Sequence, residues 1–227
     1  MLYVNNIGTL NLVKLRREYN ARLVYFSTSE VYGHLFHRNE SVKEEDLENG
    51  SIFVTTNVYA LSKLFGEAIV RHYLENYGLN AVTIRPFMVY GPGEHPSKYR
   101  SAKIIFIHSA LKGEELTVHK GAKRAWCYVS DFINGLYLVM QHSFSGKYEA
   151  FNIGSDEYHT MEEVAKIVVD ECGGAYDQIK IIESPTKFLS LTKEFSISKI
   201  RSIGYEPKTS LKEGIHEVAE WQKAKQS

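Results

Sequence analysis

The sequence has 227 residues, of which 44% are hydrophobic and 24% are charged, the composition of an ordinary globular protein. Lysine plus arginine and aspartate plus glutamate number 27 each, so no net charge favours nucleic acid or an acidic membrane surface. No apolar run approaches the ~18 residues of a membrane span, and the first residues lack the basic and cleavage-site pattern of a signal peptide.

The first predicted element is a helix over residues 2–19, in which apolar side chains recur at roughly helical spacing. Asparagine and glycine at residues 5–11 are unusual inside it, because both are weak helix formers. A glycine at such a place, here Gly8, usually permits close packing against a neighbouring backbone.

A buried strand over residues 22–26 follows and ends in the run Ser-Thr-Ser-Glu at residues 27–30. Open α/β sheets bind ligands at the carboxyl ends of their strands, so these side chains lie where a substrate is expected. Residues 34–57 are polar and acidic, and we expect them to form a surface loop over this site.

The next helix begins near Tyr59 and is expected to end at Gly78, a suitable C-terminal capping residue. It carries Tyr59 and Lys63 four positions apart, so both lie on one face, one turn apart. A phenol is a poor base at neutral pH unless its anion is stabilised, which the Lys63 ammonium would do. The phenolate could then take a proton from a substrate hydroxyl that Thr28 aligns.

The rest of the chain contains shorter predicted elements. A buried strand over residues 81–85 is broken by the run Pro86–Gly93, and strands alternating with helices in this way favour a parallel sheet. Further on we predict a helix ending at Leu111, strands at 116–119 and 126–129, a helix with Asp131 as its N-cap, and capping boxes at Thr160 and Ser210.

Cysteine and histidine give no sign of a metal site. The two cysteines, Cys127 and Cys172, lie far apart, and no two of the nine histidines have a spacing typical of metal ligands. We therefore expect two reduced, buried thiols and a cytoplasmic location, without binding to metal, nucleic acid or membrane.

The order of these motifs resembles one known family. A strand followed by Ser-Thr-Ser-Glu-Val-Tyr-Gly, a polar loop and a Tyr-x-x-x-Lys helix is similar to the extended short-chain dehydrogenase/reductases. These are the NAD-dependent nucleotide-sugar epimerases, dehydratases and decarboxylases. Segments at 85–92, 124–131 and 151–154 also resemble family signatures, so the likeness covers nearly the whole chain.

The resemblance implies roles for individual residues. It implies Thr28, Glu30, Tyr59 and Lys63 as catalytic, Ser27, Tyr59, Lys63 and Pro86 as cofactor-binding, and Asn5, Ser29, Met88 and Arg124 as substrate-binding residues. Arg124 would contact a nucleotide diphosphate, whereas Asn5 would either support the catalytic groups or be purely structural. The implied cofactor is NAD, with NADP as an alternative. The implied substrate is a UDP- or dTDP-linked sugar, and we expect a homodimer.

The implied fold is α/β, an incomplete Rossmann-like parallel sheet whose first strands are absent, with a smaller C-terminal α+β part that binds substrate. We expect the division at residues 1–95 and 96–227, with segments near 126–154 returning to the sheet. The family's Gly-x-x-Gly-x-x-Gly turn and its ribose-binding acidic residue do not occur here. We therefore expect a fragment, a truncated reading frame, or a chain completed by another polypeptide.

The reaction depends on residues beside the catalytic ones, since the family shares oxidation of the sugar C4 hydroxyl. Decarboxylases and dehydratases place a glutamate where Glu30 stands. The segments 7–11, 128–131 and 134–136 favour a UDP-glucuronate decarboxylase, but Met88 and Gly93 depart from that pattern. We expect a decarboxylase-like enzyme, with a 4-epimerase or 4,6-dehydratase as the alternative. The alternative of another class is a non-catalytic chain that binds only a nucleotide-sugar or a partner.

Overall fold

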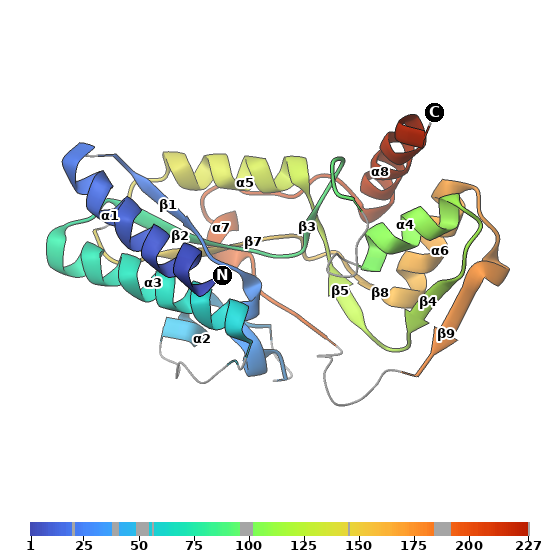
Figure 1. Ribbon diagram of the computed structural model, residues 1–227, viewed down its shortest axis with the longest axis horizontal. Helices are drawn as coiled ribbons and strands as arrows, with labels where there is room; N and C mark the ends of the chain where they lie inside the picture. The colour runs from blue at the N-terminus through green and yellow to red at the C-terminus, as the bar shows by residue number, and fades with distance from the viewer. Residues whose placement is uncertain are drawn as a thin grey trace. The chain divides into compact units, whose positions relative to one another are not determined.

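The computed structural model describes residues 1–19, 21–37, 41–48, 55, 57–95, 102–144, 146–183 and 192–226. The chain divides into two compact units, which are described in turn (Figure 1). The first comprises Met1–Phe87, Phe132–Gly154 and Glu194–Glu206, and the second comprises Met88–Asp131, Ser155–Lys193 and Pro207–Ser227.

The first unit is organised around a parallel three-stranded sheet in the order β1-β2-β7 (Figure 1). These strands are β1 (Leu23–Phe26), β2 (Ala81–Pro86) and β7 (Ala150–Ile153). Phe26 pairs with Ile84, and Ile84 pairs in turn with Phe151 on the other side. The first five residues of the central strand are buried, as its apolar sequence requires. The predicted α/β class with a parallel sheet is confirmed.

Helices cover both faces of this sheet. The π-helical turn η1 (Tyr3–Ile7), α1 (Gly8–Tyr19) and α3 (Val58–Tyr77) lie on one face, and α5 (Val129–Gln141) lies on the other. Adjacent side chains of β1 point to these opposite faces. Tyr25 packs so closely against α3 that a Cβ at Gly66 would stand 2.0 Å from its hydroxyl, whereas the Phe26 ring lies 6.2 Å from that of Phe132 in α5.

The stretch 34–57 differs from the surface loop that its polar sequence predicts. Its described part contains the end of the 3-10 helix η2 (Ser29–His37) and the short helix α2 (Glu44–Glu48). Glu44 and Leu47 are buried. The Glu44 carboxylate accepts a hydrogen bond of 2.8 Å from the backbone N–H of Asn152 in β7, which holds α2 against the sheet. The small helix α7 (Ser198–Arg201) also belongs to this unit.

The second unit combines short strand pairs with a helical layer. Its elements are β3 (Val89–Tyr90), α4 (Ala102–Leu111), β4 (Leu116–His119), β5 (Lys123–Ala125), β6 (Cys127–Tyr128), β8 (Tyr158–Thr160), α6 (Met161–Cys172), η4 (Tyr176–Gln178), β9 (Ile179–Ile182) and α8 (Leu211–Gln226). β3 pairs with β6 and β4 with β9, both in parallel, and β5 pairs with β8 antiparallel. Apolar side chains of α4, α6 and α8 form its core.

Several helix ends follow the predicted capping residues, and one does not. Gly78 ends α3 in the left-handed conformation at φ +63°, and Thr160 forms the predicted capping box with Glu163. Asp131 does not cap α5, which begins two residues earlier at Val129. Its carboxylate instead accepts hydrogen bonds from the backbone of Lys208 and Thr209, a distant partner that local sequence does not reveal.

Candidate active site

The hydroxyl run directly follows β1 and is almost fully enclosed. The backbone N–H of Ser27 donates to the Ile84 carbonyl at 2.8 Å, which carries the β1–β2 pairing one residue beyond the strand. Thr28 is only 8% exposed, and Ser27 and Ser29 are buried beside it. The Thr28 hydroxyl oxygen accepts from the backbone N–H of Glu30 at 3.3 Å, which closes a tight turn.

Glu30 lies in the first turn of η2 and is half-buried. Its backbone is fixed by the contact with Thr28, two residues before it. The helical path breaks at Gly33, whose φ of +46° is one that side-chain-bearing residues rarely adopt. The Glu30 carboxylate is therefore carried on a short, constrained segment at the carboxyl end of β1.

Tyr59 stands at the amino end of α3, where its backbone is held from two directions. The side-chain oxygen of Asn57 accepts from the Tyr59 N–H at 2.9 Å, and the Ser62 hydroxyl donates to the Tyr59 carbonyl at 2.7 Å. The Tyr59 side chain itself is 38% exposed. The phenol is accessible while the turn that carries it is fixed.

Lys63 links α3 to the end of β1. Its ammonium donates to the Phe26 carbonyl at 2.8 Å, two residues before Thr28, and lies 5.6 Å from the centre of the Tyr25 ring. The Tyr25 hydroxyl donates back to the Lys63 carbonyl at 3.1 Å. Partial burial lowers the pKa of Lys63 below its usual value. The lysine and the hydroxyl run are thus brought to the same end of one strand.

Asn5 contacts the same helix from η1. Its side-chain amide donates to the Ser62 hydroxyl at 2.9 Å, and its carbonyl accepts from the Thr9 hydroxyl at 2.5 Å. Asn5 and Lys63 both line a cavity of about 610 Å³ along α1. Asn5 therefore supports the first turn of α3 through Ser62, and Lys63 faces space in which a cofactor could bind.

The other expected site residues are placed in different parts of the chain. Pro86 ends β2 and pairs with Ile153 in the first unit. Met88 and Arg124 belong to the second unit. Met88 has a φ of +43°, rare for a residue with a side chain, and Arg124 donates to the Lys123 carbonyl at 2.7 Å.

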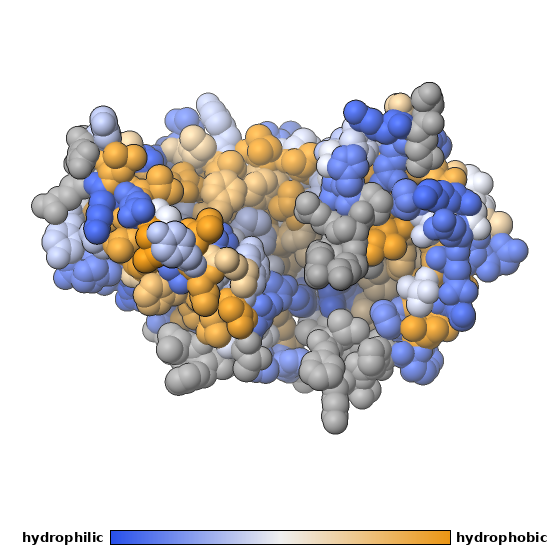
Figure 2. Space-filling model, in the orientation of Figure 1, coloured by the Kyte–Doolittle hydropathy of each residue, from blue (hydrophilic) through white to orange (hydrophobic). Residues whose placement is uncertain are grey.

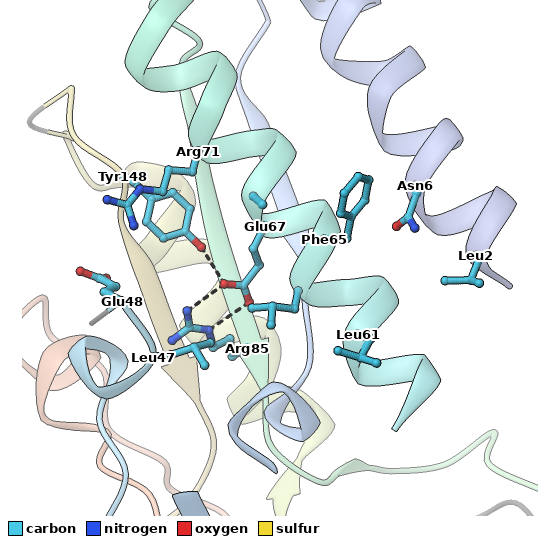
Figure 3. Close-up of a pocket in the computed structure, with 12 residues that line it drawn as sticks. Leu2, Asn6, Leu47, Glu48, Leu61, Phe65, Glu67, Arg71, Arg85 and Tyr148 are labelled. Atoms are coloured by element: carbon cyan, nitrogen blue, oxygen red, sulfur yellow. Dashed lines mark hydrogen bonds and ion pairs between the residues drawn. The ribbon is translucent and has the colours of Figure 1, made fainter. Parts of the chain in front are cut away.

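A buried ionic cluster beside these residues escaped the sequence analysis (Figure 3). Glu67, one turn after Lys63, binds Arg85 at 3.1 and 2.8 Å and accepts from the Tyr148 hydroxyl at 2.8 Å. Burial alone would raise the pKa of Glu67, but the Arg85 charge and these hydrogen bonds outweigh it and lower that pKa. One sequence signal could have predicted a buried ion pair here. Glu67 is an acidic residue four positions after Lys63, on a helix face that must be buried.

Residues 1–154 match the NAD dependent epimerase/dehydratase family. The chain belongs to this family. It is 34% identical over 215 residues to UDP-glucuronic acid decarboxylase 3 of Arabidopsis thaliana, covering 93% of this chain but 60% of that protein. The chain thus spans less than two thirds of the length of that relative.

Two solved structures of this family share the fold of the chain. dTDP-glucose 4,6-dehydratase of Bacillus anthracis, solved with NAD, gives a TM-score of 0.82 at 25% identity, covering 98% of this chain and 68% of that one. UDP-glucuronic acid 4-epimerase of Bacillus cereus, solved with UDP-glucuronic acid and NAD, gives the same four values.

Two other kinds of site are absent from the described residues. Within the ranges given above, no helix has the length and apolar character needed to cross a bilayer. The same residues contain no group of three or more histidine, cysteine, aspartate or glutamate side chains placed to hold a metal ion.

Proposed function

We propose that this chain carries the catalytic residues of an NAD-dependent enzyme that modifies a nucleotide-sugar through a 4-keto intermediate. The observation that supports this most strongly is the 2.8 Å contact between the Lys63 ammonium and the Phe26 carbonyl. It joins the Tyr59 helix to the strand end that carries Thr28. The Tyr59 phenol, the Lys63 ammonium and the Thr28 hydroxyl are thereby carried on two elements that are in direct contact.

Each residue has a separate task in the oxidation of a sugar hydroxyl. Tyr59, as the phenolate, takes the proton from the C4 hydroxyl, and Thr28 hydrogen-bonds the same oxygen and orients it. Lys63 supplies the positive charge that stabilises the phenolate. Its place in the 610 Å³ cavity fits the nicotinamide-ribose part of NAD, whose chemical contribution is to accept the hydride from C4.

Decarboxylation of UDP-glucuronate is the reaction we favour. The 34% identity to a UDP-glucuronic acid decarboxylase and the position of Glu30, two residues beyond Thr28, support it. The 4-epimerase and the 4,6-dehydratase are the alternatives, since solved relatives include both. A dTDP-linked substrate belongs to the dehydratase alternative, and NADP is the alternative cofactor.

The test is incubation of the natural polypeptide that carries this sequence with NAD and one sugar nucleotide at a time. UDP-glucuronate should release CO2 and yield UDP-xylose, whereas UDP-glucose and dTDP-glucose should remain unchanged. Formation of UDP-galacturonate or UDP-galactose would make the protein an epimerase, and a 4-keto-6-deoxy sugar would make it a dehydratase. Failure to bind NAD or any sugar nucleotide would favour a non-catalytic chain.

A homodimer is part of the proposal, and the face formed by η1, α1 and α3 supports it. Exposed apolar side chains gather there in Figure 2, among them Phe65 at 58% and Leu2 at 52% exposed. A groove of about 460 Å³ opens on this face, with Leu2, Leu61 and Phe65 on its walls and the Glu67–Arg85 pair at its base (Figure 3). A second copy would cover this apolar surface.

A further inference from the structure

The turn that carries Thr28 and Glu30 is anchored to the sheet at its amino end. The backbone N–H of Ser27 extends the β1–β2 pairing, and the N–H of Val31 donates to the Thr28 carbonyl at 3.3 Å. The helical path is broken at Gly33, so η2 is not one continuous helix beyond this turn. A side chain, that of Tyr32, supplies the second anchor.

Tyr32, the last residue before Gly33, is locked into the interior of the first unit. Its exposed fraction is 0%. Its hydroxyl donates to Oδ1 of Asn152 in β7 at 2.7 Å and accepts from Nη1 of Arg85 in β2 at 2.9 Å. The Asn152 Nδ2 donates elsewhere, to the Ser196 carbonyl at 3.2 Å, so the amide oxygen is the atom that faces Tyr32. The hydroxyl thus has one donor and one acceptor, each on a different strand.

Arg85 joins this turn to the helix that carries Lys63. Its Nε and Nη2 bind the carboxylate of Glu67 in α3, one turn after Lys63 (Figure 3). Its Nη1 donates to the Tyr32 hydroxyl instead. A guanidinium is planar and rigid, so it holds its two partners in a fixed relation to each other. The position of the Lys63 helix is therefore linked to that of the turn through two side-chain contacts.

Burial excludes Tyr32 from proton transfer. It raises the pKa of Tyr32 well above its usual value, even though the Arg85 charge acts in the opposite direction. The side chain therefore stays a neutral phenol at neutral pH. Its ring packs against other aromatic rings, with 5.8 Å to the centre of Phe36 and 6.0 Å to that of Phe87. The hydroxyl holds a position and takes no part in the chemistry.

We propose that Tyr32 is a positioning residue, whose hydroxyl, held by Arg85 and Asn152, fixes Glu30 for the step that follows oxidation at C4. This inference rests on the proposed function and adds a fully enclosed residue to it. Glu30 lies between the two anchors of the turn, two residues before Tyr32, whereas Thr28 directly adjoins the paired strand. Loss of the Tyr32 hydroxyl should therefore disturb Glu30 more than Thr28.

The test compares Tyr32→Phe with Tyr148→Phe in the natural polypeptide that carries this sequence. Each variant keeps its aromatic ring and removes one hydroxyl that is hydrogen-bonded to the Glu67–Arg85 pair. Only Tyr32 lies on the segment that carries Glu30. Tyr148→Phe is therefore the matched control for any general loss of stability.

Two measurements separate a positioning role from a purely structural one. The first is hydrogen exchange of the backbone N–H groups at residues 30 and 31, both of which bond to Thr28. We expect this exchange to be about tenfold faster in Tyr32→Phe and unchanged in Tyr148→Phe. The second is the rate of CO2 release from UDP-glucuronate relative to C4 oxidation, followed by NADH absorbance. This ratio should fall about tenfold in Tyr32→Phe, without a change in KM, and stay at the wild-type value in Tyr148→Phe.

The outcomes separate this inference from the proposed function. Exchange in Tyr32→Phe at the wild-type rate would overturn the inference, and so would an equal increase in both variants, which is the mark of general loosening. An unchanged ratio of CO2 release to oxidation would also overturn it. If wild type forms a different product, the decarboxylase function fails. The inference then stands only if Tyr32→Phe alone shows both faster exchange and slower formation of that product. A wild-type protein without turnover overturns both.

Discussion

At the scale of single residues, Tyr59 and Lys63 are expected to act as one unit, because the positive charge of the Lys63 ammonium stabilises the Tyr59 phenolate. Tyr59→Phe should lower turnover by about a hundredfold or more, as loss of a general base does. Lys63→Met should lower it nearly as far, and the double variant only slightly further. Initial rates with UDP-glucuronate measure this, with Tyr77→Phe at the far end of α3 as the control. Near-normal turnover in Tyr59→Phe would contradict the assignment.

Glu30 decides the type of reaction at the same scale. Once C4 is a ketone, loss of CO2 from C5 needs a positioned acid or base, whereas simple epimerisation at C4 does not. In Glu30→Gln we expect C4 oxidation to continue, seen as NADH absorbance at about 340 nm, while release of CO2 falls by about a hundredfold. Glu45→Gln, an exposed carboxylate in α2, should change neither signal. Interconversion of UDP-glucose and UDP-galactose that survives Glu30→Gln would identify an epimerase.

At the scale of elements, the buried Glu67–Arg85 pair connects α3 to the central strand β2. The side chains are 5% and 1% exposed. Glu67→Gln or Arg85→Met should each lower the free energy of unfolding by about 3–5 kcal/mol, because each leaves a buried charge unpaired. The double variant should lose less than the sum. Urea unfolding of the four proteins measures the coupling, and strictly additive losses would show that the pair does not act as a unit.

The buried Glu44 carboxylate in α2 should lower the free energy of unfolding as the pH rises, whereas a carboxylate stabilised by an ion pair would raise it. Burial raises the pKa of Glu44 above its usual value, even though Asn152, Lys199 and Arg85 favour the charged form. Its ionised form therefore costs stability above about pH 4.5, and the cost disappears below that value, where the group is protonated in both states.

Replacing Glu44 by glutamine tests this sign. The glutamine side chain keeps an oxygen that can accept from the Asn152 N–H but carries no charge. We expect Glu44→Gln to unfold at a higher urea concentration than wild type at about pH 7, with the difference vanishing near about pH 4. Glu45→Gln, its exposed neighbour, is the control. A variant less stable than wild type at neutral pH would show that Glu44 is stabilised as the anion.

Local patterns in the sequence predicted those elements whose causes are local. The end of α3 at Gly78 and the capping box at Thr160 depend on residues within one turn, and both occur as expected. Asp131 and Glu67 have partners 77 and 18 residues away, so no local rule reveals which residues they bind. The burial of Lys103 could not be predicted either, because its apolar surroundings come from separate segments. The catalytic roles of Thr28, Tyr59 and Lys63 remain predictions.

At the scale of the whole molecule, the apolar face of η1, α1 and α3 predicts a dimer. Phe65 is 58% exposed in the middle of α3, and Leu2 is 52% exposed beside the groove. Phe65→Glu should place a charge in the interface and yield a monomer. Ile181→Glu, at an exposed apolar position of β9 in the second unit, should leave the mass unchanged. Sedimentation equilibrium reports both masses, and a wild-type monomer at micromolar concentration would refute the prediction.

The bond from Lys63 to the Phe26 carbonyl has a consequence for how this protein can vary in evolution. Every amino acid at position 26 supplies the same carbonyl oxygen, so substitutions there leave the anchor of the lysine intact. Position 63, in contrast, needs a long side chain that ends in an amine. A saturation library should therefore tolerate many residues at position 26 and few at 63, and the two positions should not covary, although their atoms are in contact.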